Sequence, residues 1–206
     1  MEKLYHYLFM GTTMPKSIIV YPISGNPPTW GHADMMQRAS AKFDQVHWVA
    51  AINPEKKQLF SMEERMEMMK TYVDYYKLKN VYVGGHSGAI VRYALELKAS
   101  FLLRGLRNTT DFQMELELAA GNRGIDKTVE TVCMFTKPHF ATISSSLVRE
   151  LAMLGESIEQ YVHPKIIPLI QTRLRYDPIS VVFHDDNAGL TTLLWETYFR
   201  YYYQKI

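Results

Sequence analysis

The chain has 206 residues, of which 47% are hydrophobic, so it is long enough for one domain with a buried core and short appendages. Its formal net charge of +2 excludes the strongly basic composition of proteins whose main partner is nucleic acid or an anionic membrane. The single cysteine, Cys133, excludes an intramolecular disulfide framework, and no apolar run approaches the ~20 residues of a membrane helix. We therefore expect a cytoplasmic protein that binds neither nucleic acid nor a membrane.

Residues 1–16 are expected to be an N-terminal extension. The segment "LYHYLFM", residues 4–10, is short and lacks the small-residue cleavage site of a secretory signal. Met14 stands just before the first apolar run, which begins at Ser17. The folded domain is therefore expected to begin at about residue 17.

From Ser17 onward, apolar runs rich in β-branched residues alternate with segments of helical periodicity. The apolar runs predict buried strands over residues 17–21, 46–52, 80–84, 100–103 and 130–136. Helices are expected over about 32–42, 62–76, 87–98, 110–122 and 145–153, and Ser61 and Glu64 form a capping box for the second of these. The alternation is typical of βαβ units, so the sequence predicts an α/β fold: a Rossmann-like, doubly wound, parallel five-stranded sheet with flanking helices.

A last helix is expected in "HPKIIPLIQTRL", residues 163–174, because Asp177 and Pro178 break the chain soon after it. The tail over residues 175–206 is rich in aromatic residues, which we expect to serve packing or a subunit contact. The face of the 62–76 helix that carries methionines and Val73 is expected to pack in the core. The chain thus divides into an N-terminal extension, a domain over residues 17–174 and a C-terminal extension.

Polar, cationic and hydroxyl-bearing residues gather directly after the predicted strands. The segments concerned are "SGNPPTWGH" (24–32), "NPEKK" (53–57), "RGLRNTTDF" (104–112) and "ISSSLVRE" (143–150). In an open parallel sheet the carboxyl ends of the strands lie at one edge, and ligands bind there. We therefore expect these segments to build one site.

Each component of this site has an ordinary structural explanation alone, but together they favour a polyphosphate ligand. Gly31 and His32 open a helix whose free N–H groups and positive dipole end attract an anion. Arg104 and Arg107 carry planar guanidinium groups suited to phosphate, although surface ion pairs are their commoner role. The serine run at 144–146 either caps the next helix or forms a second anion cradle.

The motifs that the sequence lacks narrow the chemistry. It has neither the G-x-G-x-x-G dinucleotide motif nor the G-x-x-x-x-G-K-S/T phosphate loop. It also has no nucleophile elbow and no His/Cys cluster at zinc spacing. Nucleotidyl transfer fits this pattern, because such a reaction depends on positioning and charge stabilisation rather than on covalent catalysis.

The segment "TWGH", residues 29–32, matches the H/T-x-G-H signature of nucleotidyltransferases. The match continues in "RGLRNTTDFQMELELAAGNR" and "ISSSLVRE", in order and at familiar spacing. Over residues 17–174 the chain resembles the bacterial phosphopantetheine adenylyltransferases. The resemblance implies a Rossmann-like enzyme, usually a homohexamer, that transfers an adenylyl group from ATP to 4′-phosphopantetheine and releases pyrophosphate, giving dephospho-CoA in coenzyme A biosynthesis.

The resemblance also implies roles for residues of this chain. His32 would be catalytic and stabilise the transition state of in-line attack, and Mg2+ would accompany ATP without a dedicated protein cage. The residues that would bind 4′-phosphopantetheine are Ser24, Lys56, Ile90 and Arg104. Those that would bind ATP are Ser24, Gly25, His32, Gly105, Leu106, Arg107, Glu115, Phe140, Ala141, Thr142, Ile143, Ser144, Ser145 and Ser146.

The segment before the signature departs from the family pattern G-T/S-F-D-P, because this chain has "ISGNP" at residues 23–27. The Asn-Pro-Pro-Thr run that follows is closer to nicotinamide or nicotinate mononucleotide adenylyltransferases, which keep the reaction and change the acceptor. A catalytically degenerate relative that binds CoA or a nucleotide is another alternative. A class I tRNA synthetase fragment ranks last, since the chain has no K-M-S-K-S loop.

Overall fold

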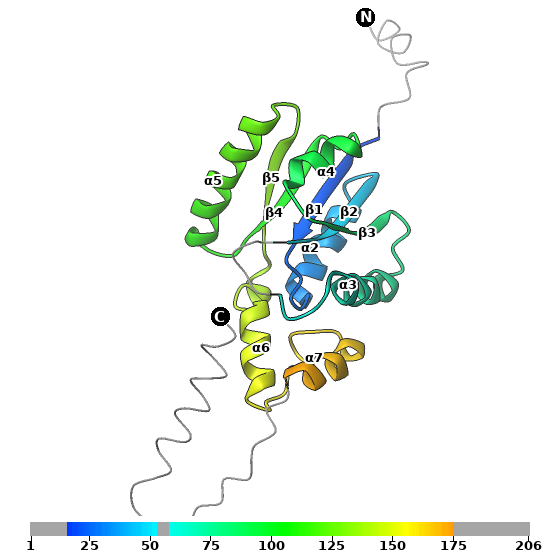
Figure 1. The fold of residues 1–206 in the computed structure, drawn as a ribbon, viewed down its shortest axis with the longest axis vertical. Coiled ribbons are helices and arrows are strands. Elements are labelled where there is room, and N and C mark those ends of the chain that lie inside the picture. The colour runs from blue at the N-terminus through cyan, green and yellow to red at the C-terminus, as the bar shows by residue number, and fades with distance from the viewer. Residues whose placement is uncertain (1–15, 53–57, 175–206) are drawn as a thin grey trace, which may run out of the picture.

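Five parallel strands form the central sheet of the computed structural model, which describes residues 16–52 and 58–174 (Figure 1). Their order across the sheet is β3-β2-β1-β4-β5, and each neighbouring pair is parallel. The doubly wound five-stranded sheet expected from the sequence is confirmed. The strands are β1 (Ile18–Ile23), β2 (Gln45–Ala51), β3 (Val81–His86), β4 (Phe101–Leu106) and β5 (Glu130–Phe135).

Helices connect the strands and cover both faces of the sheet. In the described ranges they are α2 (Trp30–Ser40), α3 (Met62–Tyr76), α4 (Ile90–Glu96), α5 (Thr109–Ile125), α6 (Ser145–Met153) and α7 (Ile167–Leu174), with 3-10 turns η1 (Pro138–Phe140) and η2 (Pro164–Ile166). The predicted capping box at the start of α3 is confirmed. The Glu64 N–H donates to the Ser61 hydroxyl at 3.2 Å, and the Ser61 N–H donates to the Glu64 carboxylate at 2.8 Å.

Three strands continue beyond their predicted ends. The predictions stopped at residues that usually interrupt a strand, but the observed strands run through these residues. Pro22 lies inside β1, opposite Val49 of β2, and β4 continues through Gly105. Gly85 lies inside β3, where a Cβ atom would stand 2.6 Å from the sulfur of Met62 on α3. Glycine is required there because the helix approaches the sheet closely, not because the strand ends.

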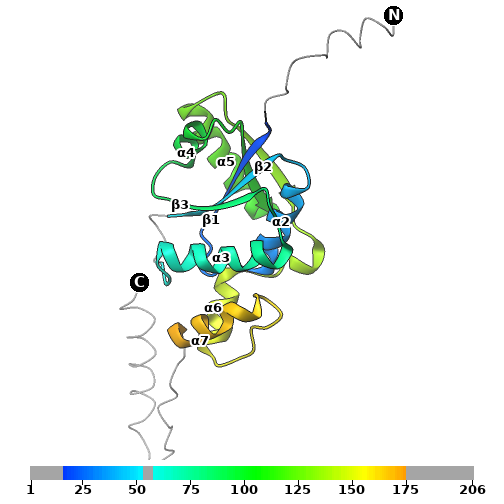
Figure 2. The same cartoon turned by 90° about the vertical axis from the view of Figure 1, so that its right-hand side faces the viewer.

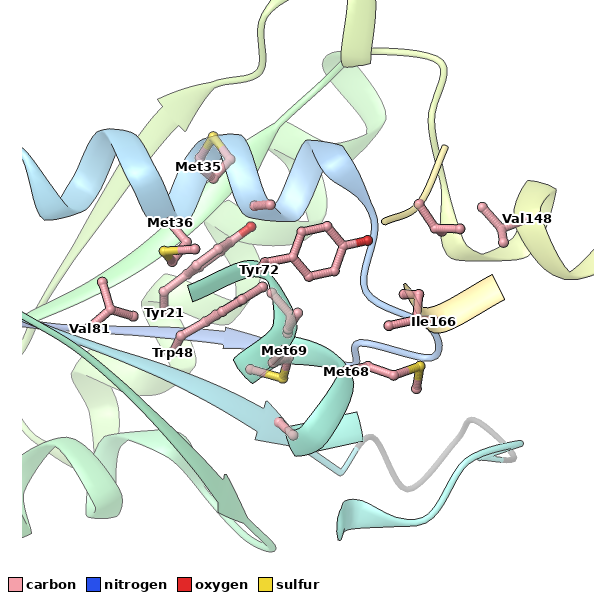
Figure 3. Close-up of a cluster of buried hydrophobic side chains, with 14 of the residues drawn as sticks. Tyr21, Met35, Met36, Trp48, Met68, Met69, Tyr72, Val81, Val148 and Ile166 are labelled. Carbon is pink, nitrogen blue, oxygen red and sulfur yellow. The ribbon is translucent and has the colours of Figure 1, made fainter. Parts of the chain in front are cut away.

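The hydrophobic core is divided between the two faces of the sheet. On one face, β1 and β2 pack with α2, α3, α6 and α7 around Trp48 and Tyr72 (Figure 3). On the opposite face a smaller cluster joins Val20 and Val49 to residues of α4. Figure 2 shows α4 and α5 on one side of the sheet and α2 and α3 on the other. The face of α3 that was assigned to packing does contribute to the first cluster, through Met62, Met66, Met69 and Val73.

One helix, α5, stands apart from this core. None of its residues is buried, although it lies beside β4 and β5 (Figure 1). Its exposed apolar side chains are Phe112, Met114, Leu116, Leu118 and Ile125. The predictions for the two terminal extensions lie outside the described residues, and within those residues no helix combines the length and apolar character of a membrane span.

Candidate active site

The start of α2 places a histidine at the carboxyl edge of the sheet. Thr29 has an extended backbone and caps the helix, and His32 stands three residues further on. The Thr29 backbone N–H donates to Nδ1 of His32 at 3.1 Å, and the Thr29 hydroxyl lies 2.9 Å from the same nitrogen. This is a capping box in which a histidine takes the place that Glu or Gln usually has.

The capping box determines which nitrogen of His32 carries the proton. A backbone N–H can only donate, so Nδ1 must accept, and the neutral ring then carries its proton on Nε2. Burial, with a smaller contribution from the charge of Arg107, lowers the pKa of His32 to about 4. Near neutral pH the side chain is therefore an uncharged hydrogen-bond donor held in one orientation.

Four main-chain carbonyls of the loop between β1 and α2 accept hydrogen bonds from side chains of α3 and α6. The donors and acceptors are Arg65 to Ser24 at 2.7 Å, Arg149 to Asn26 at 2.6 Å, Ser145 to Pro27 at 2.8 Å and Tyr72 to Pro28 at 3.1 Å. A buried carbonyl without a partner costs free energy, so these bonds favour one conformation of the loop. The segment that carries Ser24 and His32 is therefore held from two directions.

The "ISGNP" segment has a structural explanation at three of its positions. The side-chain oxygen of Asn26 accepts from the N–H groups of Leu59 and Phe60 at 3.1 and 3.2 Å. Gly25 has a φ of +56°, and a Cβ atom there would stand 3.2 Å from Cδ1 of Ile23. Ile23 is 7% exposed and belongs to the core. Its side chain fills the space beside residue 25, and glycine at that residue leaves room for it.

The two arginines near the end of β4 are paired with carboxylates of α5. Arg104 forms an ion pair through Nε with Glu115. Arg107 contacts Asp111 through Nε at 2.9 Å and Nη2 at 3.0 Å, a bidentate pair. Their hydrogen bond raises the pKa of Arg107 and lowers the pKa of Asp111. A phosphate ligand must therefore join or replace these pairs.

Gly105 and Leu106 lie between the two arginines at the end of β4, and Gly105 lies against α2. A Cβ atom at Gly105 would stand 3.4 Å from the terminal methyl of Met35 on α2. Leu106 is buried. Because its side chain packs inside the protein, its contribution to a ligand site would come from its backbone.

The serine run at the start of α6 makes hydrogen bonds within the domain. Ser144 caps α6 by accepting from the N–H three residues on at 3.1 Å. The Ser145 hydroxyl is the donor to Pro27, and the Ser146 hydroxyl accepts from Nη2 of Arg149 at 3.2 Å. The predicted helix start is confirmed, and the Ser145 bond brings it beside the loop that carries His32.

The segment before α6 lies against the first turn of α2. A Cβ atom at Gly31 would stand 3.6 Å from Cβ of Phe140. Phe140 and Ala141 are half-buried, Thr142 is exposed and Ile143 is buried. This contact places the residues from Phe140 onward next to the helix that presents His32.

The structure brings together three of the segments predicted to form the site, namely residues 24–32, 104–107 and 140–146. Arg107 is close enough to affect the pKa of His32, and Ser145 and Phe140 contact the segment around it. Glu115 reaches this edge through its pair with Arg104. Ile90 begins α4 and packs on the smaller core cluster, on the opposite face from α2. Lys56 lies outside the described residues.

Sequence reasoning missed charged side chains that hold the site segments in place through ion pairs and hydrogen bonds. Asp34 is 2% exposed and pairs with Arg38 at 3.1 Å and with Lys137, which follows β5. It thereby joins α2 to the chain that leads into residues 140–146. Arg65 and Arg149, which bond loop carbonyls, were missed as well. The signal in each case is a charged residue on an otherwise apolar helix face, where burial without a partner is costly.

Comparison with known proteins finds nucleotidyltransferases. The cytidylyltransferase-like family model matches residues 24–151. The phosphopantetheine adenylyltransferase of Clostridium perfringens is 37% identical over 155 residues, which cover 75% of this chain and 93% of that protein. The phosphopantetheine adenylyltransferase of Clostridium botulinum is 38% identical over 157 residues, covering 76% and 94%.

A solved structure shares the fold. Plasmodium falciparum nicotinic acid mononucleotide adenylyltransferase, complexed with NaAD, superposes with a TM-score of 0.58 at 14% identity, over 77% of this chain and 96% of that one. At this identity the likeness extends to the fold alone. The two clostridial enzymes have a higher sequence identity to this chain, 37% and 38%, and their matches cover most of the domain. The chain belongs to the cytidylyltransferase-like family and, within it, to the phosphopantetheine adenylyltransferases.

Proposed function

We propose that the protein transfers the adenylyl group of ATP to 4′-phosphopantetheine in the cytoplasm, giving dephospho-CoA and pyrophosphate. The observation that carries this proposal is the fixed, uncharged imidazole of His32 in the first turn of α2, with its proton on Nε2. The names of the clostridial relatives support the choice of acceptor, because those proteins match most of the domain.

In the proposed reaction a phosphate oxygen of the acceptor attacks the α-phosphorus in line with the departing pyrophosphate. Negative charge develops on the equatorial oxygens, and the Nε2–H of His32 would donate to one of them. The free N–H groups at the start of α2 add a positive field at the same place. No covalent intermediate with the protein is needed.

The two substrates would occupy different parts of the edge. ATP would lie between the end of β4 and the start of α6, with Arg107 on its phosphates and Mg2+ arriving as part of the substrate. The phosphate of the acceptor would be held by Ser24, Arg104 and Lys56, and its pantetheine arm would lie along Ile90. Within the described ranges no three His, Cys, Asp or Glu side chains form a group able to hold a metal ion.

A mononucleotide acceptor is the second candidate, and the Asn-Pro-Pro-Thr run favours it. In this chain, however, Asn26 uses its side-chain oxygen to hold the backbone of Leu59 and Phe60. The asparagine therefore has a structural role that is independent of the acceptor. The sequence relatives then favour 4′-phosphopantetheine.

The purified protein is expected to release pyrophosphate from Mg·ATP with 4′-phosphopantetheine in a coupled assay. Nicotinamide mononucleotide and nicotinate mononucleotide serve as the competing acceptors, each at matched concentration. Faster release with either mononucleotide would reassign the acceptor. No release with any of the three would favour the degenerate relative and contradict the proposal.

Replacement of His32 by alanine is expected to lower kcat by ~10²–10³, because one preorganised donor to the transition state is lost. The dissociation constant for ATP should change little, since this bond strengthens only as charge develops. Isothermal titration and the coupled assay measure the two quantities. His47→Gln, on β2 away from this edge, is the control. Loss of ATP binding with turnover retained would refute the role of His32.

The ring of His32 is expected to remain neutral from pH 5.5 to 8, which NMR of the imidazole nitrogens can follow, with His32→Gln for assignment. The pKa of about 4 in the folded protein lies below the value of ~6.5 in the unfolded chain. Protonation therefore favours unfolding, and His32 lowers the unfolding free energy by up to ~1.4 kcal/mol per pH unit as the pH falls from ~6.5 to about 4. A midpoint near pH 6.5 would contradict the half-buried ring that accepts a hydrogen bond at Nδ1.

We also propose that the protein is a homo-oligomer and that α5 contributes to the subunit contact. Phe112 and Leu116 lie one turn apart on this helix, and so do Met114 and Leu118, so it carries two apolar stripes. Exposed apolar patches of this kind mark interaction surfaces. A second copy of the chain is the occupant that the family resemblance implies.

Leu118→Lys is therefore expected to lower the mass measured by light scattering on a sizing column. Leu154→Lys, at an exposed leucine just beyond α6, is the matched control and should leave the mass unchanged. Wild-type protein that elutes at the 23.9 kDa of one chain would contradict the proposal. So would an unchanged mass in the Leu118 variant.

A further inference from the structure

Arg65 is a buried arginine that bonds the ends of two strands. Arg65 lies in the first turn of α3 and is only 1% exposed. Nη1 donates to the carbonyl of Ser24 at 2.7 Å and to the carbonyl of Ala51 at 3.0 Å. Nε lies 3.4 Å from the carbonyl of Ser61, the N-cap of the same helix. One guanidinium group therefore joins the exits of β1 and β2 to α3.

The two strand-end carbonyls lie where β1 and β2 stop pairing with each other. Ile23, the last residue of β1, lies opposite Ala50, and no further pair follows in the register of these strands. Ser24 comes directly after β1, and Ala51 is the last residue of β2. Beyond the last backbone pair, Arg65 thus connects the two strand ends through its side-chain hydrogen bonds.

The bond to Ser24 also orients the peptide that follows. The Ser24–Gly25 peptide is trans, so its C=O and N–H point in opposite directions. With the carbonyl held by Arg65, the N–H of Gly25 must point away from α3. Gly25 has a φ of +56°, in the left-handed region, on the segment that leads to Thr29 and His32.

We propose that Arg65 is a positioning residue for the adenylyl transfer proposed above, on which this inference rests. It orients the Ser24–Gly25 peptide so that the Gly25 N–H and the Ser24 hydroxyl meet the reacting phosphates. Arg65 itself touches neither substrate. Its effect is transmitted through the main chain of the loop that also carries His32.

Lysine cannot fully replace arginine in this role. The guanidinium offers five donors in a fixed planar fork, whereas an ammonium is a single point on a flexible stem. Here one guanidinium serves the carbonyls of Ser24, Ala51 and Ser61 at once. A lysine would keep the charge and one bond but would leave the other strand end without its partner.

The test compares Arg65→Met and Arg65→Lys with wild type. We expect kcat to fall at least tenfold in Arg65→Met and at least threefold in Arg65→Lys, while the dissociation constant for ATP changes less than fivefold. A small misplacement of reacting groups lowers the rate more than it lowers binding. Hydrogen exchange measured by mass spectrometry should be faster at the amides of residues 23–25 in both variants.

Arg173→Met is the matched control, because Arg173 also donates to a main-chain carbonyl, that of Leu59 at 2.8 Å, but not at a strand end. Its kcat and the exchange at residues 23–25 should match wild type. If Arg65→Met does not fold, Arg65→Lys decides the question. Wild-type kcat and exchange in a folded Arg65 variant, or equal losses in Arg173→Met, would overturn the proposal.

The failure of this inference can be told apart from the failure of the proposed function. If wild-type protein transfers no adenylyl group to any acceptor, the proposed function fails and kcat gives no comparison. The exchange at residues 23–25 is then the measurement that decides on Arg65. Unchanged exchange in the variants would show that Arg65 does not hold the strand ends.

Discussion

The hydrogen bond from the Thr29 backbone N–H to Nδ1 of His32 is the constraint on which the site depends. It closes the first turn of α2, and it leaves Nε2 as the ring nitrogen that carries the proton. Burial then keeps the ring uncharged near neutral pH. The capping contact and burial together therefore set the position, the tautomer and the charge of the side chain that we propose stabilises the transition state.

The loop around this contact owes its shape to residues far away in the sequence. Its carbonyls accept from side chains of α3 and α6, and its one internal amide side chain, Asn26, accepts from the chain that leads into α3. Loops that lack a regular hydrogen-bond ladder need such partners when they are buried. The arrangement explains how a loop with two prolines and one glycine over residues 24–29 holds a defined geometry.

Sequence periodicity was sufficient for the order and type of the elements, because buried parallel strands and amphipathic helices have distinct patterns. It failed at Pro22, Gly85 and Gly105, where a residue that normally ends a strand continues it. The gathering of site segments at one edge followed from topology alone. The bonds of Arg65 and the pair of Asp34 with Lys137 could not be predicted, since they join residues whose distance depends on the finished packing.

The attachment of α5 connects the chemistry of the edge to the outer surface of the domain. This helix has no buried residue, and two ion pairs, Arg104 with Glu115 and Arg107 with Asp111, tie it to the end of β4. An anion that draws either guanidinium away weakens one of these ties. Because coupling free energies are reciprocal, anything that clamps α5 against the sheet must change the affinity for that anion by the same factor. Anion binding at the end of β4 and the attachment of α5 to the sheet are thus thermodynamically coupled.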